Sequence, residues 1–379
     1  MVRRPLLTNI PSYFTPILLT LFSTFILWLP FLLKLKNIFG IEVENVDFSY
    51  IYRHFDGLLY IIVAKSWYYP FVIQNLGIEL PIGPEYFAAH LPLYPFLISI
   101  SASVIGYLKG MIVVTLLSSM ALSLVFFYVI RYFNLTKHPV LLTAVFMMFP
   151  RLLIVRSVGA PEALFLFLIL LSLYFFEKKE YLFAGLFGGL SVMTKTPGVL
   201  LFAAYISVAV EQYLRTRKVE KGIVWTLLIP LGLICVFIIQ SLGYGDFFAY
   251  FKSGDNIHLA FPFSVFNFQK IWIGTAWLED IVFTFFLYGL AVVYLWKSKH
   301  RSFFYFTVIF FVATICIQHR DISRYSLPMW AMACIAFDQF FTSKKFWIIF
   351  LILVPGIFLF AWNFLLYNVM PISNWAPYL

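Results

Sequence analysis

The sequence has little charge and little cysteine, and each shortage excludes a class of protein. Only 12% of its 379 residues are Asp, Glu, Lys or Arg, about half the share typical of a soluble domain. A chain this poor in charge cannot cover a water-exposed surface, which excludes a soluble protein of two or three domains. The three cysteines, Cys235, Cys316 and Cys334, lie in separate apolar runs, and their spacing predicts neither a disulfide framework nor a metal site.

Two further absences argue against a nucleotide substrate and a zinc site. The sequence has no Gly-rich phosphate loop, so it does not indicate a cytoplasmic nucleotide as substrate. It has no paired His–Glu–His motif for zinc, and Asp56, Asp246 and Asp255 do not form a compact string of metal ligands. We therefore expect a function that requires no cofactor; a divalent metal ion is compatible with it but is not indicated.

Apolar residues, by contrast, are abundant. Hydrophobic residues make up 62% of the chain, and the mean hydropathy is +0.91. Such a composition requires lipid as the solvent for most of the chain. The pattern predicts an all-α polytopic membrane protein in which residues 1–379 form a single integral membrane domain with about eleven spans. The expected spans lie near 15–35, 110–131, 139–157, 160–177, 181–194, 197–214, 222–242, 275–296, 302–318, 325–341 and 346–367.

Basic residues between these runs predict the orientation. Arg3 and Arg4 precede the first run, which we interpret as an uncleaved span. The positive-inside rule places the basic clusters and the N-terminus in the cytoplasm, and the C-terminus outside. At span ends, the net charge of +10 predicts contact with membrane lipids rather than with nucleic acid. The basic clusters lie at 131–137, 178–179, 215–221, 297–301 and 344–345. The short loops between spans favour a prokaryotic plasma membrane.

This orientation leaves two long segments outside, approximately 36–109 and 243–274. The apolar stretch 90–106 contains Pro92 and Pro95 and is short for a span, so we expect a surface or re-entrant helix there. If it crosses the bilayer instead, the chain has about twelve spans and the orientation of all later spans is inverted.

The segment YRHFDGLLY contains the first candidate for chemistry, Asp56. Asp is ionised at neutral pH because its ordinary pKa is about 3.9. A carboxylate held at the outer membrane surface can accept the proton of a hydroxyl group. An equally supported interpretation is a helix N-cap, where Asp is common. Arg53 and His54 beside it can contact a phosphate or a substrate, or simply pair at the surface.

Two more charged residues are expected at the same boundary. Glu162 lies in GAPEALF at the outer end of a span, where it suits either a first helical turn or a second acidic group of a site. Lys195 lies in MTKTPGVLL, where Pro197 and Gly198 interrupt two apolar runs. We expect it to bind a ligand phosphate or, equally, to reach lipid headgroups by snorkelling.

The outer turn HRDISRY places Arg320 and Arg324 close together. Two guanidinium groups can bind a phosphate bidentately; the alternative is a surface pair with Asp321 beside lipid headgroups. The second long outer segment begins with GDFFAYF, which contains Asp246. Its aromatic residues predict either a roof over an acceptor site or a plain aromatic belt.

Five segments in this order resemble those of a known family. They are HFDGLLY (54–60), HLPLYPFL (90–97), the stretch from PEALF to PGVLL (161–201), GYGDFFAYF (243–251) and RYSLPMW (324–330). Together they resemble the mannosyltransferase II family of glycosylphosphatidylinositol synthesis (PIG-V type) and its prokaryotic relatives, within the GT-C class of polytopic glycosyltransferases.

The resemblance implies a helical membrane bundle with a long first outer loop that bears surface helices. It implies inverting transfer of a sugar, expected to be mannose, from a polyprenyl or dolichyl phosphate to a hydroxyl of a glycan, glycolipid or protein on the outer face. Asp56 matches the acidic residue that acts as general base, and Lys195 stands where relatives often have Arg. The expected donor phosphate ligands are Arg53, Lys195, Arg320 and Arg324, and the expected substrate contacts are His54, His90, Glu162 and Asp246.

The sequence alone is also compatible with two other functional classes. A transporter or lipid flippase would show internal repeats and ionisable residues near the midplane of the membrane, whereas the charges here gather at the predicted outer edge. A non-catalytic assembly subunit would use the same scaffold for binding only.

Overall fold

The computed structural model describes residues 10–38, 40–42, 46–54, 56–254, 259–267, 278–319 and 321–379. Within these ranges the chain is mostly helical, and its strands are the short antiparallel pair β1 (Asn37–Ile38) and β2 (Ile41–Glu42). The predicted all-α polytopic architecture is confirmed.

Six helical segments in the described ranges are long and apolar enough to cross a membrane. Each has at least 18 residues, which gives a length of about 27 Å or more, close to the ~30 Å of the hydrocarbon core. All six coincide with predicted spans. They are α1 (Ile10–Leu32), α6 (Tyr107–Tyr132), η3 (Thr196–Val199) with α11 (Leu200–Thr216), η4 (Lys221–Leu227) with α12 (Leu228–Tyr244), α14 (Leu278–Leu295) and α19 (Lys344–Tyr367).

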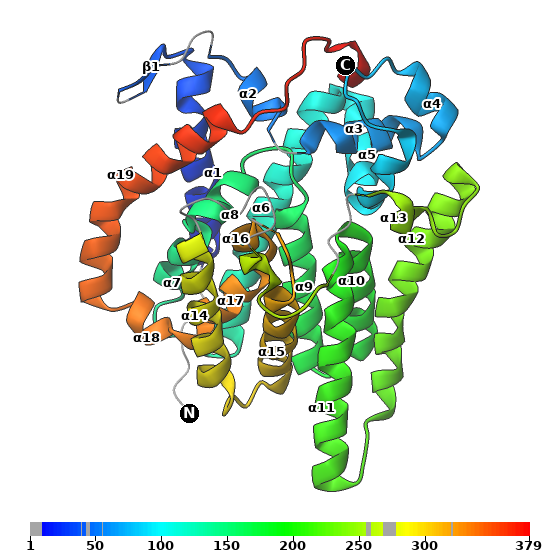
Figure 1. Cartoon of the computed structure of the whole chain (residues 1–379). Coiled ribbons are helices and arrows are strands. Elements are labelled where there is room, and N and C mark those ends of the chain that lie inside the picture. The colour runs from blue at the N-terminus through cyan, green and yellow to red at the C-terminus, as the bar shows by residue number, and fades with distance from the viewer. Residues whose placement is uncertain are drawn as a thin grey trace.

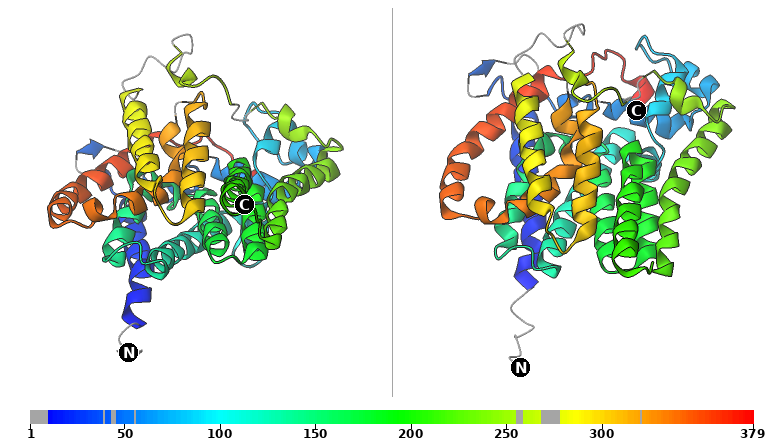
Figure 2. Two further views of the ribbon diagram at one scale, coloured as in Figure 1. Left: turned by 90° about the horizontal axis from the view of Figure 1, so that it is seen from below. Right: turned by 60° about the horizontal axis from the view of Figure 1, so that its bottom comes forward.

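Other predicted spans are shorter helices that pack among the long ones. α9 (Glu162–Glu177) lies against α6 and α10 (Tyr181–Thr194), and α15 (Arg301–Ile315) lies against α11 and α14. Because these helices have 14 to 16 residues, the predicted number of eleven full spans stays a prediction. Figure 2 shows that α19 curves around one side of the bundle.

Two predicted spans are wrong as continuous helices. The run 139–157 is interrupted at Pro150, because proline lacks a backbone donor and restricts the residue before it to an extended conformation. The run 325–341 is also divided, with Pro328 in the first turn of one of its pieces. The pieces are α7 (Pro139–Met147), α8 (Pro150–Val155), α16 (Ile322–Tyr325), α17 (Leu327–Ala336) and α18 (Asp338–Phe341).

A buried arginine holds the break between α7 and α8 against α1. Arg156 is fully buried, and its Nε donates to the carbonyl oxygen of Met147 at 3.2 Å. Its terminal nitrogens donate to Ser23 Oγ and Thr24 Oγ1, both at 2.6 Å. No carboxylate in the described part of the chain pairs with it. Hydrogen bonds to α1 therefore stabilise this buried charge.

The outer segments gather at one end of the bundle, opposite the start of α1 and the α11–α12 connection (Figure 1). A helix forms at the stretch predicted to be a surface or re-entrant helix and packs against α3 and α6; its depth in the membrane stays a prediction. The C-terminal residues return to this end, where the Met370 backbone amide donates to the Arg53 carbonyl at 2.7 Å. The segments are α2 (Ser49–Tyr52), α3 (Gly57–Ser66), α4 (Pro70–Asn75), η2 (Pro84–Ala89), α5 (Leu93–Ile105), α13 (Ala249–Lys252), η5 (Ser264–Phe266) and η7 (Ala376–Tyr378).

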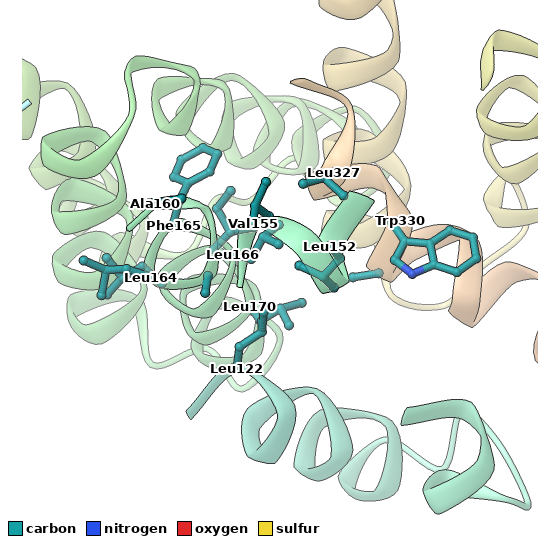
Figure 3. Packing of buried hydrophobic residues seen from close by; sticks show 14 of the residues in the cluster. Leu122, Leu152, Val155, Ala160, Leu164, Phe165, Leu166, Leu170, Leu327 and Trp330 are labelled. Atoms are coloured by element: carbon teal, nitrogen blue, oxygen red, sulfur yellow. The ribbon is translucent and has the colours of Figure 1, made fainter. Parts of the chain in front are cut away.

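The core lies where α8 and α9 meet α6 and α17. Figure 3 shows Leu152 of α8 and Leu170 of α9 among the buried side chains, with Leu122 of α6 and Trp330 of α17 at the edges. All four are at most 5% exposed. This packing fixes the N-terminal end of α9, where Glu162 lies.

Glycines permit the close contact between α10 and α12. A methyl group added to Gly189 would lie 2.7 Å from the Leu228 carbonyl oxygen, and one added to Gly232 would lie 2.5 Å from the Gly189 carbonyl oxygen. Small residues let helix backbones approach closely in membranes, where van der Waals packing drives association. This contact positions the C-terminal end of α10, which leads into Lys195.

We expect Gly232→Ala to lower the thermal unfolding midpoint in detergent by several degrees, because overpacking at such a contact costs about 1–3 kcal/mol. Gly356→Ala in α19 is the matched control, since a methyl group there meets no atom within 4 Å. Equal midpoints for the two variants would contradict the close contact between α10 and α12.

Candidate functional site

Four of the predicted charged residues meet at the outer end of the bundle. Glu162 Oε1 accepts hydrogen bonds from Lys195 Nζ at 2.8 Å and from Arg324 Nε at 2.7 Å. Arg324 Nη1 lies 3.8 Å from Asp56 Oδ2. Segments far apart in the sequence thus form a continuous row of alternating charges, which we call the charged cluster (Asp56, Glu162, Lys195 and Arg324).

The members of the charged cluster differ in exposure. The side chains of Glu162 and Arg324 are 3% and 8% exposed, whereas those of Lys195 and Asp56 are 19% and 39% exposed. Charges this deeply buried are tolerated only when they are paired and hydrogen-bonded. A buried ion pair therefore supports two partly exposed charged groups of opposite sign.

The start of α3 determines where Asp56 lies. Asp56 occupies the N-cap position of α3, but its side chain makes no capping hydrogen bond. The N-cap interpretation therefore explains its backbone position and not its carboxylate, which faces Arg324. A methyl group on Gly57 would lie 2.6 Å from the Gly159 carbonyl oxygen, so this end of α3 directly contacts the turn that precedes α9.

Helix ends also position Glu162 and Lys195. Glu162 begins α9, as the first-turn interpretation predicts, and its Oε2 is buried without a hydrogen-bond partner among the described residues. Lys195 links α10 to η3 with an extended backbone (φ −150°, ψ 132°). Its ammonium group pairs with Glu162 and lies 5.7 Å from the ring centroid of Tyr325, so it is directed inward rather than snorkelling to headgroups.

Two buried histidines flank the charged cluster. Burial lowers the pKa of His90 to about 4, although the charge of Asp56 acts in the opposite direction. Burial, reinforced by the positive charges of Arg151 and Arg324, also lowers the pKa of His54 well below its ordinary value. Both imidazoles are therefore neutral at pH 7 and provide polar groups without added charge.

Two predicted site residues, Arg53 and Asp246, make contacts outside the charged cluster. The Arg53 guanidinium lies over the Tyr50 ring, 4.6 Å from its centroid. The Asp246 carboxylate pairs with Lys252 and accepts from the Phe248 backbone amide at 3.0 Å. Arg320 lies outside the described residues, so the clamp predicted from Arg320 and Arg324 stays a prediction.

A further arginine, Arg151, is not among the predicted site residues, because it lies within the run predicted to be one span. It pairs with Asp321 and lies 4.4 Å from the centroid of the Phe364 ring. Asp321 thus makes an ion pair with the first turn of α8. Pro150, directly before Arg151, was the available signal, because a helix that begins at this proline places Arg151 in its first turn.

The second long outer segment also reaches this region. The hydroxyl groups of Tyr250 and Thr196 lie 2.7 Å apart, which joins α13 to the turn that carries Lys195. Among the described residues, no group of three His, Cys, Asp or Glu side chains could hold a metal ion. The site instead presents two cations and one partly exposed carboxylate.

No family model and no curated protein matches the chain, so the resemblance to the PIG-V type family stays a prediction. Solved structures do match. ArnT from Cupriavidus metallidurans bound to undecaprenyl phosphate gives a TM-score of 0.56 at 13% identity, over 89% of this chain and 62% of that one. The archaeal oligosaccharyltransferase AglB from Archaeoglobus fulgidus, in complex with an inhibitory peptide and a dolichol-phosphate, gives 0.54 at 11% identity, over 96% and 57%.

At these identities the likeness shows the fold alone, and it confirms the predicted GT-C-like architecture. The chain spans less than two thirds of the length of either structure.

We expect Glu162→Gln to lower the thermal unfolding midpoint markedly, because loss of one member of a buried ion pair costs about 3–5 kcal/mol. The matched control is Glu42→Gln, which changes an exposed carboxylate in β2. An unchanged midpoint in Glu162→Gln, measured in detergent beside that control, would show that Lys195 and Arg324 do not depend on this carboxylate.

The histidines predict an acid-dependent loss of stability. The unfolded chain binds a proton at an ordinary histidine pKa of 6.5, whereas folded His90 binds one at about 4. Stability is therefore full above pH 6.5 and falls as the pH decreases toward 4, by at most about 3 kcal/mol for this residue. We expect His90→Gln to reduce the pH dependence of the unfolding midpoint between pH 4.5 and 7, and the exposed His138→Gln to retain it.

Proposed function

We propose that this protein transfers a sugar from a polyprenyl or dolichyl phosphate carrier to an acceptor hydroxyl on the outer face of the membrane. The observation that carries the proposal is the position of Asp56, 3.8 Å from an Arg324 side chain that is itself held by buried Glu162. The fold supports it, because two solved proteins of similar fold are described with undecaprenyl phosphate and dolichol-phosphate. Mannose is the sugar that the sequence resemblance favours.

In the proposed reaction the acceptor oxygen attacks the anomeric carbon of the sugar from the face opposite the phosphate. The bond between that carbon and the phosphate oxygen breaks, which inverts the configuration. Asp56 takes the proton of the acceptor hydroxyl as general base. The carrier leaves as a phosphate monoester with one more negative charge than it had in the donor.

Arg324 and Lys195 are proposed to stabilise that additional charge. Glu162 engages Arg324 through Nε, and Arg324 Nη1 lies 3.8 Å from Asp56 Oδ2. Fixed charge-assisted donors of this kind are often the largest contribution to catalysis. The charged cluster has two positive groups, Lys195 and Arg324, and two negative groups, Asp56 and Glu162. It is therefore neutral as a whole.

Proton transfer changes this balance in the direction that the reaction requires. When Asp56 becomes protonated, the charged cluster gains one net positive charge while the leaving phosphate gains one negative charge. The attraction between site and leaving group therefore increases as the reaction proceeds, which is stabilisation of the transition state rather than of the substrate. His90 and His54, both buried and neutral, add no charge to this balance.

Asp56→Asn tests the proposal directly. With polyprenyl-phosphate mannose as donor, we expect the purified variant to bind the donor at least as tightly as the wild type but to transfer sugar about 10²–10⁴ times more slowly. Glu42→Gln, an exposed carboxylate of the same outer segment, controls for a general loss of negative charge.

Two results would contradict the proposal. Transfer at the wild-type rate by Asp56→Asn would exclude Asp56 as the base. Movement of the lipid-linked sugar across vesicle membranes by the wild type, without its consumption, would favour a flippase over a transferase.

A further inference from the structure

A second site lies at the opposite end of α11 from Lys195. It is a pocket of about 730 Å³ between the C-terminal end of α11 and the N-terminal end of α15. α11 has 17 residues, so about 25 Å of helix separates the pocket from the charged cluster. We propose that this pocket binds the phosphate headgroup of an anionic membrane phospholipid, a function separate from sugar transfer. The charged residues that line it are Glu211, Arg215, Lys297, Lys299 and Arg301.

The pocket has an excess of positive charge, with four cations and one carboxylate. Both oxygens of that carboxylate, Glu211, are engaged: Oε2 accepts from Arg301 Nε at 2.7 Å, and Oε1 accepts from Arg215 Nη2 at 2.5 Å. Lys297 and Lys299 are exposed and form no ion pair with any described residue. Of the three excess positive charges, two are therefore on lysines that are available to a ligand anion, and the third stays with the two arginines that share Glu211.

Arg301 is fixed before any ligand binds. Its guanidinium carbon lies 4.6 Å from the centroid of the Phe304 ring and 5.1 Å from that of Tyr305. Its Nη1 donates to the Trp296 carbonyl at 2.6 Å. Because the side chain is already ordered by these contacts, binding a phosphate costs it little further conformational freedom.

Apart from Ser298, the uncharged residues of the pocket wall are mainly hydrophobic or aromatic. Phe304, Tyr305 and Val308 follow Arg301 along α15 toward the middle of the bundle. Trp296, which also lines the pocket, is 63% exposed. An exposed Trp beside basic residues is typical of the boundary between headgroups and acyl chains.

An occupant must therefore combine an anionic phosphate with hydrocarbon. A nucleotide or inorganic phosphate would satisfy the lysines and leave the apolar wall in contact with water. An anionic phospholipid satisfies both, and basic pockets between membrane helices at the cytoplasmic side suit such headgroups. The pocket lies at the end predicted to face the cytoplasm.

Phosphatidylglycerol titrated into the purified full-length protein in detergent tests the proposal, with bound lipid counted by native mass spectrometry. We expect saturable binding that the double variant Lys297→Ala/Lys299→Ala weakens about thirtyfold at low salt. Lys344→Ala/Lys345→Ala is the matched control, because it removes two exposed lysines at the same predicted face outside the pocket and should bind as the wild type does. Phosphatidylcholine should bind weakly to all three.

Three outcomes would overturn the proposal. Equal loss of binding in both double variants would indicate general attraction to a basic surface. Equal affinity for phosphatidylcholine would exclude recognition of the negative charge. Displacement of phosphatidylglycerol by an equal concentration of inorganic phosphate would show that the apolar wall contributes nothing. Sugar transfer by Lys297→Ala/Lys299→Ala is expected to be unchanged in detergent, so this test is independent of the proposed reaction.

Discussion

The shared carboxylate of Glu162 is the contact on which the outer site depends. One of its oxygens accepts both the Lys195 ammonium and the Arg324 guanidinium, so a single buried atom joins the first turn of α9 to the turn after α10 and to α16. Without that negative charge, two cations would lie together in an apolar setting, where their repulsion and lost hydration are both unfavourable. Because Arg324 is held from its Nε side, its opposite side faces Asp56. The geometry of the exposed part of the site therefore follows from a buried interaction behind it.

Much of the fold could be predicted from hydrophobicity and charge alone. Long apolar runs bounded by basic clusters mark α1, α6, α11, α12, α14 and α19, because a span must satisfy its backbone internally and place its charges at the ends. The failures at 139–157 and 325–341 have a different cause. Hydropathy does not reveal a break within an apolar run, whereas a residue such as Pro150 does. However, a proline is compatible with either one kinked helix or two short helices. Packing against α1 and α19 decides between them here.

The sequence predicted which residues are candidates for the site, but not how they pair. Asp56, Glu162, Lys195 and Arg324 were each recognisable as charged residues at a membrane boundary, where an ionisable group needs a partner. Their mutual pairing was not recognisable, because it depends on the contact of Gly57 with Gly159, which no periodicity reports. Asp246 shares the same boundary and the same residue type, yet it pairs locally with Lys252. Location at the boundary thus selects candidates, and only the helix packing decides which of them meet.

The buried Arg156 has a consequence for the order in which the bundle assembles. An isolated guanidinium entering a lipid bilayer is costly, but the hydroxyl groups that receive Arg156 belong to α1. Since α1 is synthesised more than a hundred residues before α8, Ser23 and Thr24 are already in the membrane when Arg156 leaves the ribosome. Arg156 can therefore form hydrogen bonds with α1 as soon as it enters the membrane, so the first span must be in place before α8 can pack stably.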